Sequence, residues 1–322
     1  MIQRISKKLQ RKDTVIDMGT RNITSVILDD EQKVCQYCQW DGYPTGAGAS
    51  ILEFLKDCNF EQFKKALENT KINVVDYNHA YSYTGSPKNI GDISEMVFKM
   101  RSKLRDENPD GDYPSNEEAL KRMLEKGMIT EQQAEEFYVS TRDTGCDVLP
   151  YIYNRSLDKP PLEIYAMAEE FNGEYSWDIQ GIYILNLDEM TLDMTYNGFN
   201  KIFDITNIPL DIDREMIVLE ECINNLSNAL DYGNCNNLQL KAEYMTDELI
   251  KNIKENKYIE DVTDEDLVYM REFAEKYFKE TLELRLNKEV QKSIDNTIAG
   301  AEERSAENKT EESVNRSEIE ME

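Results

Sequence analysis

Residues 18–57, MGTRNITSVILDDEQKVCQYCQWDGYPTGAGASILEFLKD, carry the strongest fold signal in this sequence. Within it, residues 20–28 and 33–40 both alternate in side-chain character, and the polar segment Asp29–Gln32 separates them. This pattern is typical of a β-hairpin. The glycine-rich residues 41–48 end the second strand, and an apolar helix is expected to follow.

A second hairpin is expected far along the chain. Residues 175–187 and 191–196 alternate in the same way about a turn at 188–190. Strands and helices do not alternate regularly, which disfavours a parallel doubly wound sheet. We therefore expect an α+β fold in which an antiparallel sheet, built from two sequence-distant hairpins, is covered by helices and followed by a helical C-terminal extension.

Two helices are marked by their end signals. Ser115 and Thr130 begin capping boxes, and Gly127 between them is a C-terminal cap, so the sequence predicts helices near 116–126 and 131–140. Further helices are expected over 60–70, 93–104, 162–170, 212–230 and 263–290, residues 72–76 are expected to be extended, and the segment that ends at Tyr153 fits a helix or a strand.

The predicted domains are an N-terminal extension (1–17), an α+β domain (18–210), a helical extension (211–295) and a disordered acidic tail (296–322). In the tail the Glu, Ser and Asn content rises and aromatic residues vanish.

Residues 1–17 have two interpretations. Met18 is a candidate start, because the residues after Met1 lack apolar periodicity beyond one turn. Alternatively, Thr14–Asp17 (TVID) is a strand that extends the first strand of the sheet.

Composition limits the expected partners. The 322 residues include 64 acidic and 37 basic side chains, a net charge of −27. Such a charge repels nucleic-acid phosphates and anionic membranes, so neither is an expected partner. No run of 18 or more apolar residues occurs, and the basic N-terminal segment lacks the apolar core of a signal peptide, so a cytoplasmic protein is expected.

No metal or cofactor is expected. The six cysteines are scattered and are expected to be reduced thiols in a chain without a secretion signal. Strand alternation sends Cys35 and Cys38 to opposite faces, which does not suit a zinc or redox CxxC site. His79 is the only histidine.

Four segments carry a resemblance to a known family: MGTRN (18–22), QYCQWDGYPTGAG (36–48), TRDTG (141–145) and the hairpin from Trp177 to Phe199. They resemble an uncharacterised family found in bacteriophages, prophage-bearing bacteria and fungi, whose members usually begin at the Met of MGTRN. The resemblance covers roughly residues 18–205 and brings no established activity. It implies a common domain, a candidate site and, for a phage-encoded protein, the host cytoplasm as location.

This chain departs from that family pattern in three ways. It has seventeen residues before Met18, Cys38 stands where Gly is usual, and an acidic helical extension follows about residue 210. The extension leaves open whether this chain works as the shorter members do.

The candidate ligand-binding residues are Arg21, Asp41, Tyr43 and Arg142. An antiparallel hairpin brings Arg21, near the start of the first strand, close to Asp41 at the end of the second, and Arg142 would form a second wall. The alternatives are a salt bridge that ties the strand ends together and, around Arg142, a turn that ends a helix. The glycines of 41–48 either turn the chain or prepare an anion site at a helix start.

The predicted function is a binding or host-modulating protein with a small polar-ligand pocket near the QWDGYP turn and a host or phage protein as partner. One alternative is a hydrolase-like enzyme that uses Asp41 with Arg21 and Arg142, although removal of Met18 would expose Gly19, which is not a nucleophile. A third possibility is an acidic inhibitor that mimics nucleic acid; 37 basic side chains mixed among the acidic ones favour a solvated surface instead.

Overall fold

The computed structural model describes residues 19–75, 88–109, 111, 113–140, 144–174, 179–231, 238–255 and 263–284. The chain divides into two compact units, 1–216 and 217–322, and each is described by itself. The predicted extension 1–17 and tail 296–322 lie outside the described residues, as do His79, Arg142 and Trp177.

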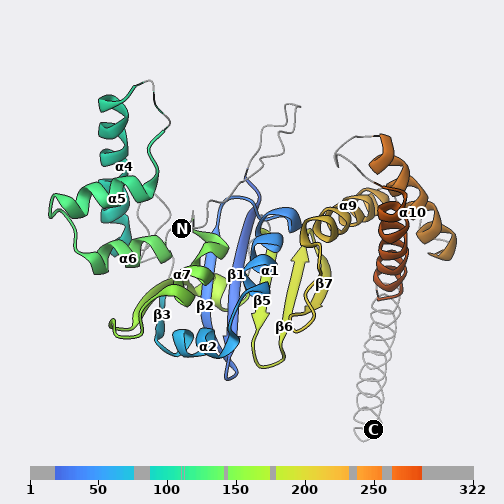
Figure 1. Ribbon diagram of the computed structural model, residues 1–322, viewed down its shortest axis with the longest axis horizontal. Helices are drawn as coiled ribbons and strands as arrows, with labels where there is room; N and C mark the ends of the chain where they lie inside the picture. Colours follow the sequence, from blue (N-terminus) through green and yellow to red (C-terminus); the bar gives the residue numbers. More distant parts are fainter. Residues whose placement is uncertain are drawn as a thin grey trace, which may run out of the picture. The chain divides into compact units, whose positions relative to one another are not determined.

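A five-stranded sheet forms the centre of the first unit (Figure 1). Its order is β2-β1-β5-β6-β7, and neighbouring strands are antiparallel except for the parallel pair β1 and β5. The predicted α+β class and both predicted hairpins are confirmed. The strands are β1 (Arg21–Leu28), β2 (Glu31–Cys38), β5 (Ile179–Asn186), β6 (Thr191–Tyr196) and β7 (Phe199–Asp204).

Tight two-residue turns set the register of the hairpins. Asp29 and Asp30 between β1 and β2 have φ of 56° and 58°, and Asn197 and Gly198 between β6 and β7 have φ of 48° and 77°. Positive φ at both central residues is the geometry that matches the twist of antiparallel strands. The second of these turns adds β7, a strand that the sequence analysis did not predict.

The two hairpins are tied together at their turns. The carboxylate of Asp188, in the turn between β5 and β6, accepts the backbone N–H groups of Asp29 and Asp30 at 3.0 and 2.9 Å. These hydrogen bonds lower the pKa of Asp188 below its ordinary value. A side chain from one hairpin therefore caps the turn of the other.

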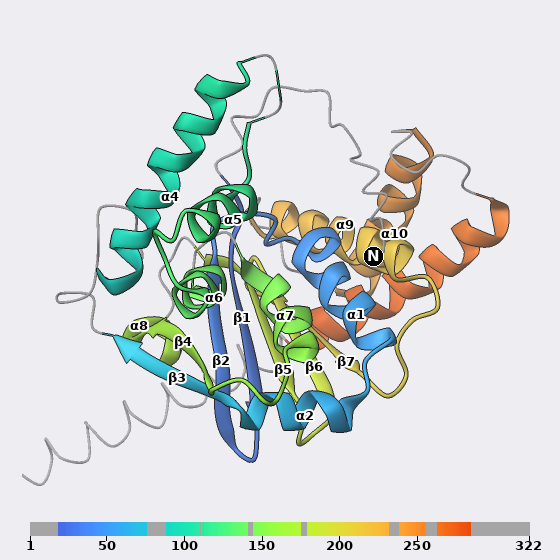
Figure 2. The same ribbon diagram turned by 60° about the vertical axis from the view of Figure 1, so that its left-hand side comes forward.

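A small parallel sheet covers one face of β1 and β2. It consists of β3 (Thr70–Val75) and β4 (Leu162–Met167), and Figure 2 shows it crossing the larger sheet. Ile23, Cys35 and Ala166 are buried together in this layer. Cys38 lies on the opposite face beside Gly145, which confirms that the two cysteines point to different sides.

One expectation about these elements is wrong. Residues 162–170 form β4 followed by the short α8 (Ala168–Phe171) rather than one helix, because the apolar run of β4 pairs with β3. β2 lies at an edge of the larger sheet, while β1 and β5 are inside it.

Helices over the other parts of the unit follow their predicted ranges. α2 (Phe60–Glu68), α4 (Lys88–Glu107), α5 (Asn116–Glu125) and α6 (Glu131–Ser140) match the expected helices, whereas the 44–48 turn is a single helical turn that leads into α1 (Ala49–Lys56). A short turn at Gly145–Asp147 follows. The segment that ends at Tyr153, which fitted either a helix or a strand in the sequence, forms the helix α7 (Val148–Asn154).

Local caps explain α5 and α6. Ser115 Oγ accepts the N–H of Glu118 at 3.1 Å, and Thr130 Oγ1 accepts that of Gln133 at 3.2 Å. Gly127 has φ of 63°, as a C-terminal cap requires. Both capping boxes predicted from the sequence therefore define helix starts.

The second unit is helical where it is described. It contains the later part of α9 (Ile212–Asp231), α10 (Leu238–Glu255) and a helix over 264–284. Cys222, Leu249 and Phe278 are fully buried. Burial raises the pKa of the Cys222 thiol well above its ordinary value. This thiol is therefore an inert part of the helical core rather than a reactive group.

Candidate functional site at the turn of residues 39–48

The structure places three of the four predicted site residues at one end of the β1–β2 hairpin. Asp41 is exposed, and Arg21 and Tyr43 are half-buried. The Tyr43 hydroxyl donates to Asp41 Oδ1 at 2.9 Å, and the backbone N–H of Arg21 donates to Gln180 Oε1 at 3.1 Å. Between Arg21 and Asp41, both of which are described, there is no ion pair. Arg142 lies outside the described residues, so its place beside Asp41 stays a prediction.

Asp41 has an unusual backbone conformation. Its φ is 53°, in the left-handed region that side chains other than those of Asn, Asp and Gly rarely adopt. The backbone N–H of Gly42 donates to Thr20 O at 2.9 Å, and that of Ala47 donates to Asp41 O at 2.8 Å. The strained residue is thus held by hydrogen bonds on both sides, which is the condition under which such strain persists.

Two buried side chains donate hydrogen bonds to the backbone of the same turn. Asn22 Nδ2 donates to Trp40 O at 2.8 Å, and the Tyr183 hydroxyl donates to Gly42 O at 2.9 Å. Asn22 is 1% exposed and Tyr183 is fully buried; the Tyr183 bond is buried and the Asn22 bond is partly buried. The turn is therefore anchored to β1 and to β5, two neighbouring strands that are distant in sequence.

Glycines let the backbone segments approach closely. A Cβ on Gly181 would lie 2.1 Å from the carbonyl oxygen of Gly42, and one on Gly19 would lie 2.3 Å from Trp40 Cε3. Real Cβ contacts are not this short, so a side chain at either position would displace the turn. Residues 19–22, the QWDGYP segment and the start of β5 are packed together as one unit.

The anchored turn presents aromatic and acidic side chains. Trp40 is 46% exposed and stands beside the exposed Asp41, whose carboxylate is oriented by Tyr43. A carboxylate that accepts from one aromatic side chain and adjoins another in sequence suits a cationic group, which gains an ion pair and cation–π attraction. A rigid backbone reduces the ordering cost of such binding.

Sequence reasoning missed the supporting residues Asn22, Tyr183 and Gly181. Gly181 carried a usable signal, since a glycine within an alternating strand often marks a close backbone approach. Asn22 and Tyr183 gave no such signal, because the backbone carbonyl groups to which they donate lie far from them in the sequence.

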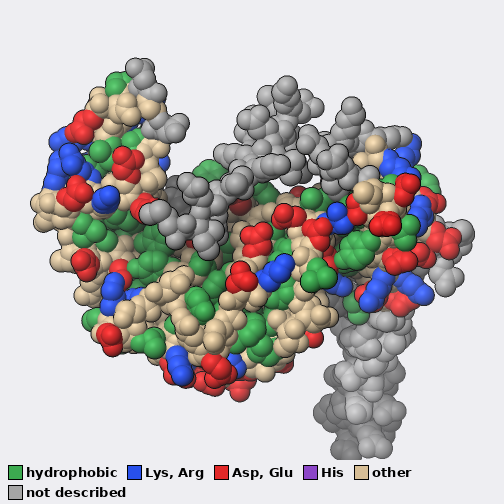
Figure 3. Space-filling view, viewed as in Figure 1, with side chains coloured by type: hydrophobic (Ala, Val, Ile, Leu, Met, Phe, Trp, Pro, Cys, Tyr) green, Lys and Arg blue, Asp and Glu red, His purple; other side chains and the backbone are tan. Residues whose placement is uncertain are grey.

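The described residues contain no group of three or more His, Cys, Asp or Glu side chains that could hold a metal ion. No helix in the described part of the chain is long and apolar enough to cross a membrane. On the face drawn in Figure 3, Lys and Arg side chains lie among Asp and Glu rather than apart from them. That distribution does not resemble the continuous acidic surface that a nucleic-acid mimic needs.

Comparison of the chain with protein-family models, with curated proteins and with solved structures finds no match.

Proposed function

We propose that this chain is a binding protein whose turn at residues 39–48 recognises a cationic group, a lysine or arginine side chain of a partner protein. The observation that carries the proposal is the left-handed Asp41, held by its neighbours with its carboxylate exposed next to Trp40. Backbone strain of this kind is concentrated at functional sites.

Charge supports the same class of ligand. The net charge of −27 attracts cationic partners over distances of about one Debye length, roughly 8 Å at physiological salt, and repels anionic ones. At short range, Asp41 would accept a charge-assisted hydrogen bond while the exposed Trp40 ring contacts the stem or the charge of the ligand. Long-range charge then brings the partner in, and the turn selects the group that docks.

The experiment uses a capped hexa-arginine peptide titrated into the full chain by isothermal titration calorimetry at physiological salt. Asp41→Asn keeps the shape of the side chain and tolerates positive φ, so the variant should melt as the wild type does. It should weaken peptide binding about tenfold, because a hydrogen bond to a charged group contributes about 1.5–3 kcal/mol.

The matched control is Glu53→Gln, which removes the same charge from an exposed position on α1. It should change the affinity less than twofold. Equal weakening by the two variants would mean that only net charge matters, and absence of binding to the wild-type chain would remove the proposal.

A further inference from the structure

The first described residues of the chain lie beside the candidate site. Gly19 is so close to Trp40 that a Cβ on it would lie 2.3 Å from the ring atom Cε3. The next residue, Thr20, accepts the backbone N–H of Gly42 on its carbonyl oxygen at 2.9 Å. The residues that precede Gly19 in the sequence are therefore tethered next to the exposed Asp41.

The tethered residues include a cationic segment. Residues 1–12, MIQRISKKLQRK, carry five of the 37 basic side chains of the sequence and none of its 64 acidic ones. In a chain whose net charge is −27, this segment is a local concentration of positive charge. The connecting residues 13–18 contain two carboxylates, which the Asp41 carboxylate repels. Residues 1–12 are thus the part of the tether that suits the turn.

The tether is long enough for the cationic side chains to reach Asp41. Lys12 is eight positions from Thr20, and at 3.3–3.6 Å per residue it can lie up to roughly 28 Å away. Asp41 precedes Gly42, whose backbone is bonded to Thr20, so the distance to be covered is far shorter. The segment can therefore turn back onto Asp41 without disturbing β1.

The Asp41 carboxylate is able to accept such a cation. Its Oδ1 accepts the Tyr43 hydroxyl at 2.9 Å, and it forms no ion pair with any residue that the structure describes. The turn around it is already held by backbone and side-chain hydrogen bonds. A tethered ligand on a preformed site has a smaller entropy loss to overcome than a free one.

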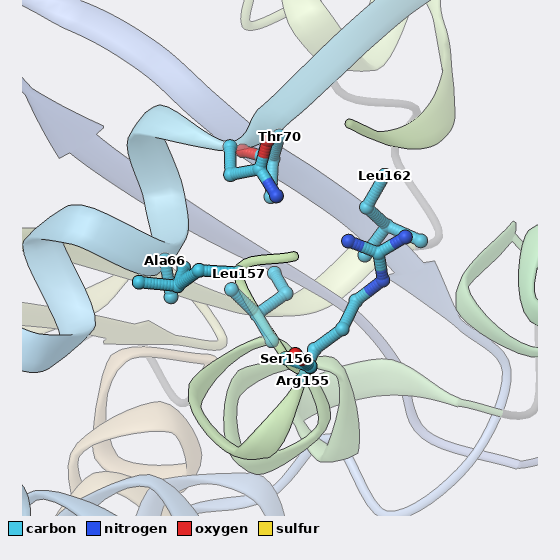
Figure 4. Close-up of a pocket in the computed structure, with 8 residues that line it drawn as sticks. Ala66, Thr70, Arg155, Ser156, Leu157 and Leu162 are labelled. Carbon is cyan, nitrogen blue, oxygen red and sulfur yellow. The ribbon is translucent and has the colours of Figure 1, made fainter. Parts of the chain in front are cut away.

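Two other places on the first unit are poorer docking sites for a cationic segment. The depression drawn in Figure 4 is lined by Arg155, and both Arg155 and Lys159 pair with the single carboxylate of Glu135, which leaves a positive excess. The Asp188 carboxylate lies at the opposite end of β1 and already accepts two backbone N–H groups. Charge and position therefore both favour the turn of residues 39–48.

On the basis of the cation-binding function proposed above, we infer that residues 1–12 occupy this turn as an internal competitor, which a lysine or arginine of a partner protein must displace. A short tether raises the effective concentration of a ligand to about 1 mM. With a Kd of about 0.1 mM for the untethered segment, the turn would be vacant in roughly one molecule in ten, and the affinity for a partner would fall about tenfold. Only strongly cationic partners would then bind.

The test is isothermal titration calorimetry of full-length chains with the capped hexa-arginine peptide. The neutralised chain replaces four basic side chains of the segment: Lys7→Gln, Lys8→Gln, Arg11→Gln and Lys12→Gln. It should bind the peptide about tenfold more tightly than the wild type, because the internal competitor is lost. Asp41→Asn in the neutralised chain should reverse this gain.

A control chain loses the same number of positive charges from exposed lysines elsewhere in the first unit: Lys65→Gln, Lys103→Gln, Lys121→Gln and Lys126→Gln. Its affinity should stay within about twofold of the wild type. Equal gains in the control and neutralised chains would overturn the internal competitor, because net charge alone would explain them. If the wild-type and neutralised chains bind the peptide equally well, the cation-binding function stands and only the internal competitor is wrong. If neither binds it, the cation-binding function fails and the internal competitor fails with it.

Acrylamide quenching of tryptophan fluorescence measures docking of the segment without any added ligand. Trp40 should be quenched more strongly in the neutralised chain than in the wild type, because the segment no longer covers its ring. The difference should disappear when Trp40→Phe is introduced into both chains, which leaves Trp177 as the only tryptophan. Tighter peptide binding without a change in quenching would mean that the segment acts by charge alone and does not dock, which also overturns the proposal.

Discussion

The α5–α6 hairpin and the turn of residues 39–48 are both short segments held by side-chain hydrogen bonds to the backbone, yet the bonds span very different lengths of chain. Thr130 caps α6 through Gln133, three positions away. Tyr183 holds the turn through Gly42, 141 positions away. The helical hairpin can thus form its caps from local sequence, whereas the turn acquires its shape only when β1 and β5 are paired.

Glycines in the two regions differ in the same way. Gly127 at the end of α5 has φ of 63° and open space around it, so it is needed for its backbone conformation alone. Gly181 in β5 has no positive φ, and it is needed because the Gly42 carbonyl occupies the place of a Cβ. One glycine serves local geometry and the other serves close packing between distant segments.

The largest effect is expected from Gly181→Ala. The added methyl group meets backbone rather than a flexible side chain, so we expect a loss of about 3 kcal/mol in the free energy of unfolding, measured in urea. Gly198→Ala is the control: nothing lies within 4 Å of its Cβ position, and its φ of 77° should cost about 1 kcal/mol. A smaller loss for Gly181→Ala than for Gly198→Ala would mean that the turn is not packed on β5 as described.

A smaller, local effect is expected from Thr130→Ala. Loss of the cap should cost about 1 kcal/mol and should speed hydrogen exchange in residues 131–140 while leaving 179–186 unchanged. Thr130→Ser, which keeps the hydroxyl, should exchange nearly as the wild type does. Equal loss of protection in both ranges would show that the hairpin and the sheet open as one unit, which contradicts the contrast between them.

The smallest effect is expected from the hydrogen bonds of Asp188, which are exposed to solvent. Because its folded pKa lies below the unfolded value, its contribution is present above that unfolded value and is lost as the pH falls through the folded pKa. The difference in stability between the wild type and Asp188→Asn should therefore shrink between about pH 5 and pH 3. A difference that stays constant across this range would show that the Asp188 charge does not stabilise the turn of Asp29 and Asp30.

Secondary structure was predictable wherever the signal was local. The capping boxes marked α5 and α6, and alternation marked both hairpins. β4 was mistaken for a helix because LEIYAM is an apolar run of either type, and its pairing with β3 joins Thr70 to Leu162 across the chain. The missed strand β7 did have a local signal, the Asn197–Gly198 dipeptide.

The position of the candidate site could be predicted from the sequence, but the contacts within it could not. Strand alternation located Asp41 at the end of β2 and brought it to the same end of the hairpin as Arg21. The hydrogen bond from the Tyr43 hydroxyl to the Asp41 carboxylate depends on the left-handed backbone of Asp41. The backbone hydrogen bonds of Gly42 and Ala47 hold Asp41 in that conformation. The Asp41–Gly42 pair signals a turn in the sequence, but it does not specify which side chain donates to the Asp41 carboxylate.

The α+β class, the hairpins, the capped helices and the position of the turn could be predicted from the sequence alone, because they depend on interactions between residues a few positions apart. The parallel pairing of β1 with β5, and the support that Gly181 and Tyr183 give to the Gly42 carbonyl, became known only from the folded chain. These features arise where segments distant in sequence exclude water together, and the free energy of that burial depends on all the segments at once.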